Sequence, residues 1–149
     1  MKKMEYEIVK LEPVTIAGIA LRTENTAAGF ENIQAHWGRF FKETILEKVP
    51  AKKEEAIYEA YFDYESDARG PYTLLLGARV EDGAAVGDGM TVHTLPATSY
   101  AKFLINDPNG VRAAWEEIWG RSDLDRSYSG DFEIFRKEAV ELYVAVRSE

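Results

Sequence analysis

The same order of predicted elements occurs twice along this chain, and that repetition limits the possible folds more than any other feature. Each half predicts two strands, a helix that carries a tryptophan, and two further strands. An aromatic-Glu-aliphatic-aromatic motif follows each helix, at residues 58–61 and 132–135, and the preceding tryptophans are Trp37 and Trp115. We interpret the pattern as a duplication of one unit, and we expect a groove where the two halves meet.

Hydrophobic periodicity and turn residues place the boundaries of these elements. In the first half we expect two strands, 5–11 and 14–23, and then a helix whose apolar stripe runs from Phe30 to Ile45. A hairpin of the strands 56–65 and 72–81 follows. A Gly-rich connector, 81–89, precedes the second half. There Asp107 is expected to cap the helix, and the strands are 90–94, 98–106, 131–138 and 140–147. The prediction is a single domain over residues 1–149, with pseudo-repeats at about 4–81 and 90–147.

Composition and charge exclude several classes of protein. The chain has 149 residues, of which 46% are hydrophobic, which suffices for one domain with a sizeable core. It has no cysteine, which excludes disulfides and thiolate metal sites and fits a reducing cytoplasm. The formal net charge of −8, without a basic cluster, argues against direct binding of nucleic acid. With no recognisable signal peptide and no apolar run of membrane-spanning length, we expect a cytoplasmic protein without membrane contact.

The last predicted hairpin gives the strongest indication of a binding site. Glu133 and Phe135 share one face of its first strand, while Glu141 and Tyr143 share the non-aliphatic face of its second strand. We therefore expect both carboxylates on one side of the hairpin, beside aromatic rings. An aromatic ring attracts a cation by about 0.5–2 kcal/mol, and a carboxylate in a low-dielectric pocket adds Coulomb attraction. The alternative is a solvated sheet face in which Phe135 and Tyr143 are cross-strand partners.

Other acids and aromatic residues favour ordinary structural roles. One strand face of the first half carries three acids, which favours a solvated surface: Glu59, Asp63 and Glu65. Trp37 and Trp115 lie on apolar helical stripes, where core packing is the simpler interpretation, although a tryptophan at a helix–sheet margin can line a pocket.

Motifs for a metal, a cofactor or a catalytic triad are missing. His36 and His93 are the only histidines, and neither has a partner at metal-ligand spacing. The chain contains no Gly-x-Ser-x-Gly elbow, no Gly-x-Gly-x-x-Gly turn and no Walker loop. We therefore expect no metal and no cofactor.

Four segments of the second half, taken together, resemble a known family. They are residues 100–103, 115–119, 130–135 and 141–145, and the Asp-Phe-Glu-x-aromatic strand is the most specific of them. The chain resembles the effector-binding domain of AraC- and MerR-type activators and of gyrase-inhibitor-like proteins. The resemblance implies an α+β fold in which duplicated strand-strand-helix-strand-strand units form a curved antiparallel sheet with two main helices. It also implies a cleft at the pseudo-twofold axis that binds small molecules, often cationic and amphipathic ones.

The resemblance implies that Glu133 contacts the positive charge of the ligand. It places Glu141, Tyr143 and Tyr100 near the ligand. We expect further walls from four aromatic residues, the last two being weaker candidates from the first half: Trp115, Phe135, Trp37 and Tyr61. The chain departs from the family pattern at Phe135, where a tyrosine is common, and at Ala145, where a proline is common. No helix-turn-helix precedes the domain, so any role in transcription is expected to be indirect.

The resulting hypothesis is a stand-alone domain that binds cationic, lipophilic, drug-like compounds and either sequesters them or senses them. We expect binding in preference to catalysis. Two alternatives remain open. In one, Glu133 and a tyrosine hydrolyse a strained electrophilic ring. In the other, the chain is a protein-interaction module, as gyrase-inhibitor-like relatives suggest, and its partner is a protein.

Overall fold

The computed structural model describes residues 4–67 and 69–147. Its elements alternate strands and helices in the order that the sequence predicts. They are β1 (Glu7–Leu11), β2 (Val14–Thr23), α1 (Ala27–Lys42), α2 (Ile45–Lys48), β3 (Ile57–Phe62), β4 (Tyr72–Arg79), β5 (Thr91–Leu95), β6 (Thr98–Ile105), the 3-10 helix η1 (Pro108–Gly110), α3 (Val111–Trp119), β7 (Asp131–Phe135) and β8 (Val140–Val146). None of the helices in these described ranges combines the length and apolar character that crossing a bilayer requires.

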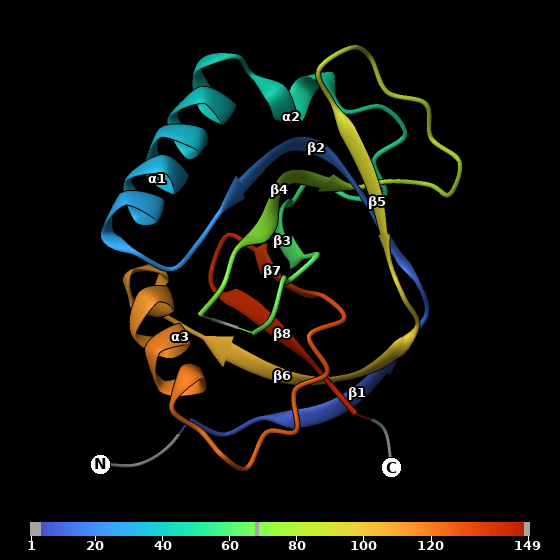
Figure 1. The fold of residues 1–149 in the computed structure, drawn as a ribbon. Coiled ribbons are helices and arrows are strands. Elements are labelled where there is room, and N and C mark those ends of the chain that lie inside the picture. Colours follow the sequence, from blue (N-terminus) through green and yellow to red (C-terminus); the bar gives the residue numbers. More distant parts are fainter. Residues whose placement is uncertain (1–3, 68, 148–149) are drawn as a thin grey trace.

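The eight strands form one antiparallel sheet whose order reflects the duplication. The order is β1-β6-β8-β7-β3-β4-β2-β5. The counterparts in the two halves are β1 and β5, β2 and β6, β3 and β7, and β4 and β8. Exchanging each strand for its counterpart gives the same order, read from the other edge of the sheet. The first strand of each half pairs with a strand of the other half: β1 pairs with β6, and β5 pairs with β2. The strands β3 and β7 meet at the centre of the sheet. Figure 1 shows the sheet curving strongly, with α1 and α3 at one side of it. The α+β fold with a curved antiparallel sheet is confirmed.

Two cores lie under the helices, and a third fills the opposite face of the sheet. The α1 core includes Phe40, packed with residues of β2 and β4, and the α3 core includes Ile118, packed with residues of β6 and β8. The third core holds residues from both ends of the sheet, including Leu95 of β5 and partly buried Val9 of β1. Curvature brings these distant strands into one core, because a sheet that bends around its own side chains needs no second layer on that face.

Two helices depart in detail from the periodicity of the sequence. The apolar stripe that predicts one helix up to Ile45 is divided, because the chain turns at Thr44, whose φ is 49°. The helix of the second half, α3, is preceded by the short turn η1, in which the Asp107 side chain accepts a hydrogen bond from the Asn109 backbone N–H. Asp107 therefore caps η1, as expected for the start of this helical segment, whereas Gly110 precedes α3 and provides no side-chain cap.

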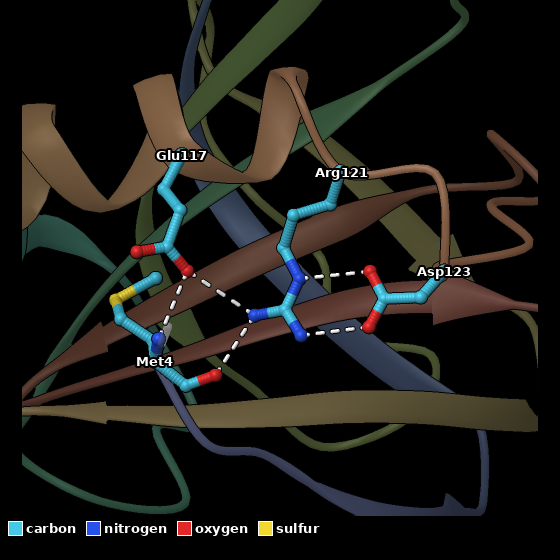
Figure 2. A network of polar contacts seen from close by, with 4 residues as sticks. All are labelled: Met4, Glu117, Arg121 and Asp123. Carbon is cyan, nitrogen blue, oxygen red and sulfur yellow. Dashed lines mark hydrogen bonds and ion pairs between the residues drawn. The ribbon is translucent and has the colours of Figure 1, made fainter. Parts of the chain in front are cut away.

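A polar network joins the start of the described chain to the end of α3 (Figure 2). The guanidinium of Arg121 donates to both carboxylate oxygens of Asp123, at 2.9 and 2.7 Å, and to the Met4 carbonyl at 2.8 Å. Glu117 accepts from Arg121 at 3.2 Å and from the Met4 backbone N–H at 3.0 Å. The Arg121 side chain is only 7% exposed. The network therefore holds the segment that leads into β1 against α3.

Candidate functional site

A cavity lies between the two main helices, over the centre of the sheet. It holds about 790 Å³ of empty space, part of which is open to solvent. Helix α1 contributes Trp37 to its wall and helix α3 contributes Trp115, while Glu59 of β3 lies at its floor. The remaining lining residues are mostly aromatic or polar: Asn25, Phe30, Ile33, Gln34, Tyr61, Tyr64, Tyr72, Val111, Arg112, Trp119 and Arg126. The duplication therefore produces a cavity where the two halves meet.

Two glutamates lie side by side beneath this cavity. Glu59 on β3 is the cross-strand partner of Glu133 on β7. Their exposed fractions are 4% and 0%. Directly opposed residues of an antiparallel pair have Cβ atoms about 4.5–5.5 Å apart, so the two carboxyl groups share one small volume. Two buried negative charges at that separation repel each other strongly, because little water screens them.

Each glutamate accepts a hydrogen bond from the tryptophan of its own half. The Trp37 indole N–H donates to Glu59 Oε2 at 3.0 Å, and the Trp115 indole N–H donates to Glu133 Oε2 at 2.5 Å. Tyr61 adds a third donor, since its hydroxyl lies 2.8 Å from Glu133 Oε1. The two repeated sequence features, a tryptophan and a glutamate, therefore meet in space in both halves.

Burial raises the pKa of two of these residues, Glu133 and Tyr61. Burial raises the pKa of Glu133 well above its ordinary value, and the neighbouring Glu59 raises it further, while the hydrogen bonds from Trp115 and Tyr61 oppose the shift. Burial also raises the pKa of the Tyr61 phenol, with added effects from Glu133 and Glu59, which keeps its hydroxyl protonated as a donor. The raised pKa favours the protonated form of Glu133 when the site is empty.

The prediction that Glu133 and Glu141 share one side of the hairpin is wrong. In the observed register Glu133 lies opposite Leu142, and Glu141 lies opposite Ile134. Cross-strand partners project to the same face of a sheet, so Glu133 lies on the helix side with the aliphatic residues of β8, and Glu141 lies on the other side. Alternation within one strand identifies which of its residues share a face. It does not specify the register, which decides how the faces of two strands match.

Three of the expected ligand-binding residues therefore lie away from the cavity. Tyr143 stacks on Phe132 in the core of the opposite face, with ring centroids 4.5 Å apart, and Tyr100 makes an edge contact with the Tyr143 ring at 6.1 Å. Glu141 accepts a hydrogen bond from the Tyr143 hydroxyl at 2.8 Å and forms an ion pair with Arg136 at 2.6 Å. The structure joins these residues into a separate cluster.

The other expected residues lie on the helix side. Trp37, Tyr61 and Trp115 line the cavity. Glu133 lies behind Tyr61 and Trp115, which donate to its two oxygens, and it does not itself line the cavity. Phe135 contacts the Trp37 ring edge-on at 5.1 Å. The structure thus brings Glu133, Trp115, Trp37 and Tyr61 together, with Phe135 as support.

Glu59 is the residue whose role the sequence indicated least well. Its strand face carries three acids, which favours a solvated surface, yet Glu59 is buried and lines the cavity floor. Its acidic neighbours Asp63 and Glu65 are exposed, because β3 ends at Phe62 and they follow it. The useful signal was its position in the repeated motif, which is equivalent to that of Glu133.

A second polar group at the cavity is formed by Arg126 and Asp131. Arg126 lies in the loop between α3 and β7, and its guanidinium donates to Asp131 Oδ2 at 2.7 Å. Asp131 is 0% exposed and also accepts from the Tyr64 hydroxyl at 2.5 Å and the Ala145 backbone N–H at 2.8 Å. Sequence reasoning missed Arg126, because an irregular loop gives no periodicity that would orient its side chain.

These features define a ligand-binding domain: a duplicated sheet with an acidic, aromatic cavity between its helices. The chain belongs to the Cass2 family of integron-associated effector binding proteins, whose family model matches residues 7–146. It is 29% identical, over 94% of its length, to the protein YobU of Bacillus subtilis (strain 168), of which 96% is covered.

Solved structures confirm the fold. The integron cassette protein VCH_CASS2 of Vibrio cholerae superposes with a TM-score of 0.74 at 21% identity, covering 98% of this chain and all of that one. A structure of SAV2435 bound to tetraphenylphosphonium superposes with a TM-score of 0.80 at 20% identity, covering 97% of this chain and 95% of that one. The predicted resemblance to effector-binding domains is therefore confirmed.

Proposed function

We propose that this protein binds lipophilic organic cations in the cavity between α1 and α3, and sequesters or senses them there. The observation that carries the proposal is the buried pair Glu59 and Glu133 at the base of an aromatic cavity. Glu59 contacts the cavity directly, and Glu133 lies just beneath it, where a bound cation would favour its ionised form.

In the empty site the buried carboxylates carry a free-energy cost, and a bound cation would remove it. A buried carboxylate without a positive partner is costly, and a second carboxylate beside it raises that cost. A cation in the cavity stabilises the ionised forms by Coulomb attraction in a medium that screens weakly. The rings of Trp37, Trp115 and Tyr61 add dispersion and cation–π attraction. Neither kind of attraction requires strict geometry, which suits a site that accepts several ligands.

The size and charge of the ligand follow from the same residues. A buried pair of acids matches a positively charged ligand, and a mostly aromatic lining matches a bulky aromatic body. Tetraphenylphosphonium has this combination, and it is the molecule bound to the structural neighbour SAV2435. Its charge is also shielded by phenyl groups, so it enters an apolar cavity with a small loss of hydration.

The test compares two ions of the same shape and opposite charge, tetraphenylphosphonium and tetraphenylborate, by isothermal titration calorimetry. We expect the phosphonium to bind and the borate not to bind. Glu59→Gln and Glu133→Gln should each weaken phosphonium binding by about tenfold or more, equivalent to ~1.4 kcal/mol. Both substitutions keep the size of the side chain and its ability to accept the indole hydrogen bond.

Two further variants separate a local effect from a general one. Glu65→Gln removes a charge from a side chain that is 69% exposed, so it controls for net charge and should leave the affinity unchanged. Glu141→Gln removes the acid on the opposite face of the sheet. Equal binding of the two ions would contradict the proposal, and a loss of affinity only in Glu141→Gln would place the site on the other face.

The geometry gives less support to ring hydrolysis. A general base needs an oxygen within hydrogen-bonding reach of the substrate or its water. Both oxygens of Glu133 already accept hydrogen bonds from Tyr61 and Trp115, and Glu133 does not line the cavity. The same arrangement suits a group that acts through its charge.

A further inference from the structure

We propose that Arg126 forms a second recognition point in this cavity, which binds a hydrogen-bond-accepting oxygen of the ligand. The preferred ligand would then be an aromatic cation that also carries a carbonyl or carboxylate oxygen. This inference rests on the proposed function of the glutamate pair, and it adds a specificity that charge and aromatic surface do not provide.

The guanidinium of Arg126 has hydrogen-bonding capacity that the protein leaves unused. Arg126 is 8% exposed and lines the cavity. It donates to Asp131 at 2.7 Å. Its Nε atom is buried and has no hydrogen-bond partner among residues 4–67 and 69–147. A buried donor without a partner is unusual, because it has lost water and gained nothing in return.

Asp131 is well placed to hold Arg126 but cannot satisfy all of its donors. One of its oxygens accepts from the Ala145 backbone N–H at 2.8 Å. The other accepts from both the Tyr64 hydroxyl, at 2.5 Å, and Arg126. The aspartate therefore fixes the position of the guanidinium and compensates its charge. A ligand group at Arg126 consequently needs an acceptor oxygen but no negative charge.

The rings around Arg126 orient its guanidinium within the cavity wall. Its central carbon lies 4.3 Å from the Tyr128 ring centroid, 6.0 Å from that of Tyr64 and 5.9 Å from that of Trp115. Trp115 is also the residue whose indole N–H donates to Glu133. One indole ring thus lies beside both polar groups.

A row of three tyrosine rings connects the two polar groups along the sheet. Tyr61 donates to Glu133 and Tyr64 donates to Asp131, and the Tyr72 ring lies between them, at 5.8 and 5.6 Å from their ring centroids. Asp131 and Glu133 are two residues apart on β7, about 7 Å along a strand and on the same face. The two polar groups therefore lie next to each other along β7.

The test uses three dyes with the same cationic tetramethyl-xanthylium ring system. Tetramethylrosamine has no carbonyl group, tetramethylrhodamine methyl ester has a neutral ester, and tetramethylrhodamine has a carboxylate. Fluorescence anisotropy titrations measure the affinity of each dye for the full chain. We expect the ester to bind at least about fivefold more tightly than the rosamine, the effect of one net hydrogen bond. The carboxylate should bind at least as well as the ester.

Arg126→Lys is the matched variant, because it keeps a positive charge for Asp131 and removes the planar guanidinium with its additional N–H donors. In this variant we expect the ester to lose its advantage, so that the ester and the rosamine bind with equal affinity. Circular dichroism and thermal unfolding establish that the variant is folded. If it does not fold, equal affinity of the ester and the rosamine for the original chain still overturns the role of Arg126.

The outcomes distinguish this inference from the function on which it rests. Equal affinity of the three dyes for the original chain, with weaker binding in Glu59→Gln, would overturn only the role of Arg126. Binding of none of them would overturn the proposed function. A preference for the ester that persists in Arg126→Lys would assign the acceptor contact to another residue.

Discussion

Glu59 and Glu133 are directly opposed on β3 and β7, and they occupy the same position in the two copies of one sequence motif. The pseudo-twofold relation of the halves therefore brings two equivalent acids together at the centre of the sheet. Each acid also has an equivalent tryptophan donor, Trp37 for Glu59 and Trp115 for Glu133. The charge of Glu59 at this point raises the pKa of Glu133.

The glutamate pair predicts that stability falls as the pH rises. The pKa of Glu133 in the folded chain is raised above its ordinary value of 4.5, mainly by burial. The folded chain therefore holds a proton that the unfolded chain releases, and this stabilisation is lost as the pH rises through the folded-state pKa. The effect on the free energy of unfolding is at most about 1.4 kcal/mol per pH unit for one proton.

Urea denaturation at a series of pH values above the ordinary glutamate range tests this prediction. In Glu133→Gln the decrease should be smaller than in the original chain, because the variant has no proton to lose at that position. A variant with the same pH dependence as the original chain would show that Glu133 ionises normally.

The indole hydrogen bond to Glu133 predicts a specific cost for Trp115→Phe. The substitution keeps an aromatic ring and removes a donor that lies 2.5 Å from a buried carboxylate oxygen. We expect the free energy of unfolding to fall by about 1–3 kcal/mol, because the acceptor loses a partner that water does not replace. The loss should grow as the pH rises, since the ionised carboxylate needs the donor more than the protonated form.

Trp119→Phe is the control for this prediction, measured by thermal and urea unfolding. Trp119 also lies on α3 and lines the cavity, but it is 36% exposed and stacks on Phe30, with ring centroids 6.5 Å apart. We expect a smaller loss of stability without the pH dependence. Identical behaviour of the two variants would mean that ring size, and not the hydrogen bond, explains the effect.

The surroundings of Gly77 and Gly38 predict opposite effects on stability when each glycine is replaced by alanine. Gly77 lies opposite Gly18, and a Cβ atom at Gly77 would lie 1.8 Å from the Ala17 carbonyl oxygen. Gly77→Ala should therefore destabilise the protein by about 3 kcal/mol, because backbone atoms would have to move. At Gly38 on α1 a Cβ meets nothing within 4 Å, and Gly38→Ala should stabilise the helix by up to about 1 kcal/mol.

Thermal unfolding of the two alanine variants checks this pair. If Gly77→Ala were as stable as the original chain, the two strands would have room to separate at that position.

The sequence predicted the elements well and the location of the site in part. Strand alternation and helical periodicity are local properties, so the order of strands and helices and the cap at Asp107 followed directly from the residues. The family resemblance identified Glu133 as a central acid. The mistaken inferences, that Glu133 and Glu141 share a face and that Glu59 is solvated, concern relations between strands.

The sequence by itself determined a duplicated α+β chain with an aromatic residue and an acid at equivalent positions in each half. Only the tertiary structure decided that β3 and β7 pair in the register that places Glu59 beside Glu133, and that Arg126 reaches the same cavity from a loop. The physical reason is that register and loop conformation are set by packing across the whole sheet. Shifting the pairing of two strands by one residue moves every side chain to the other face without changing the local pattern.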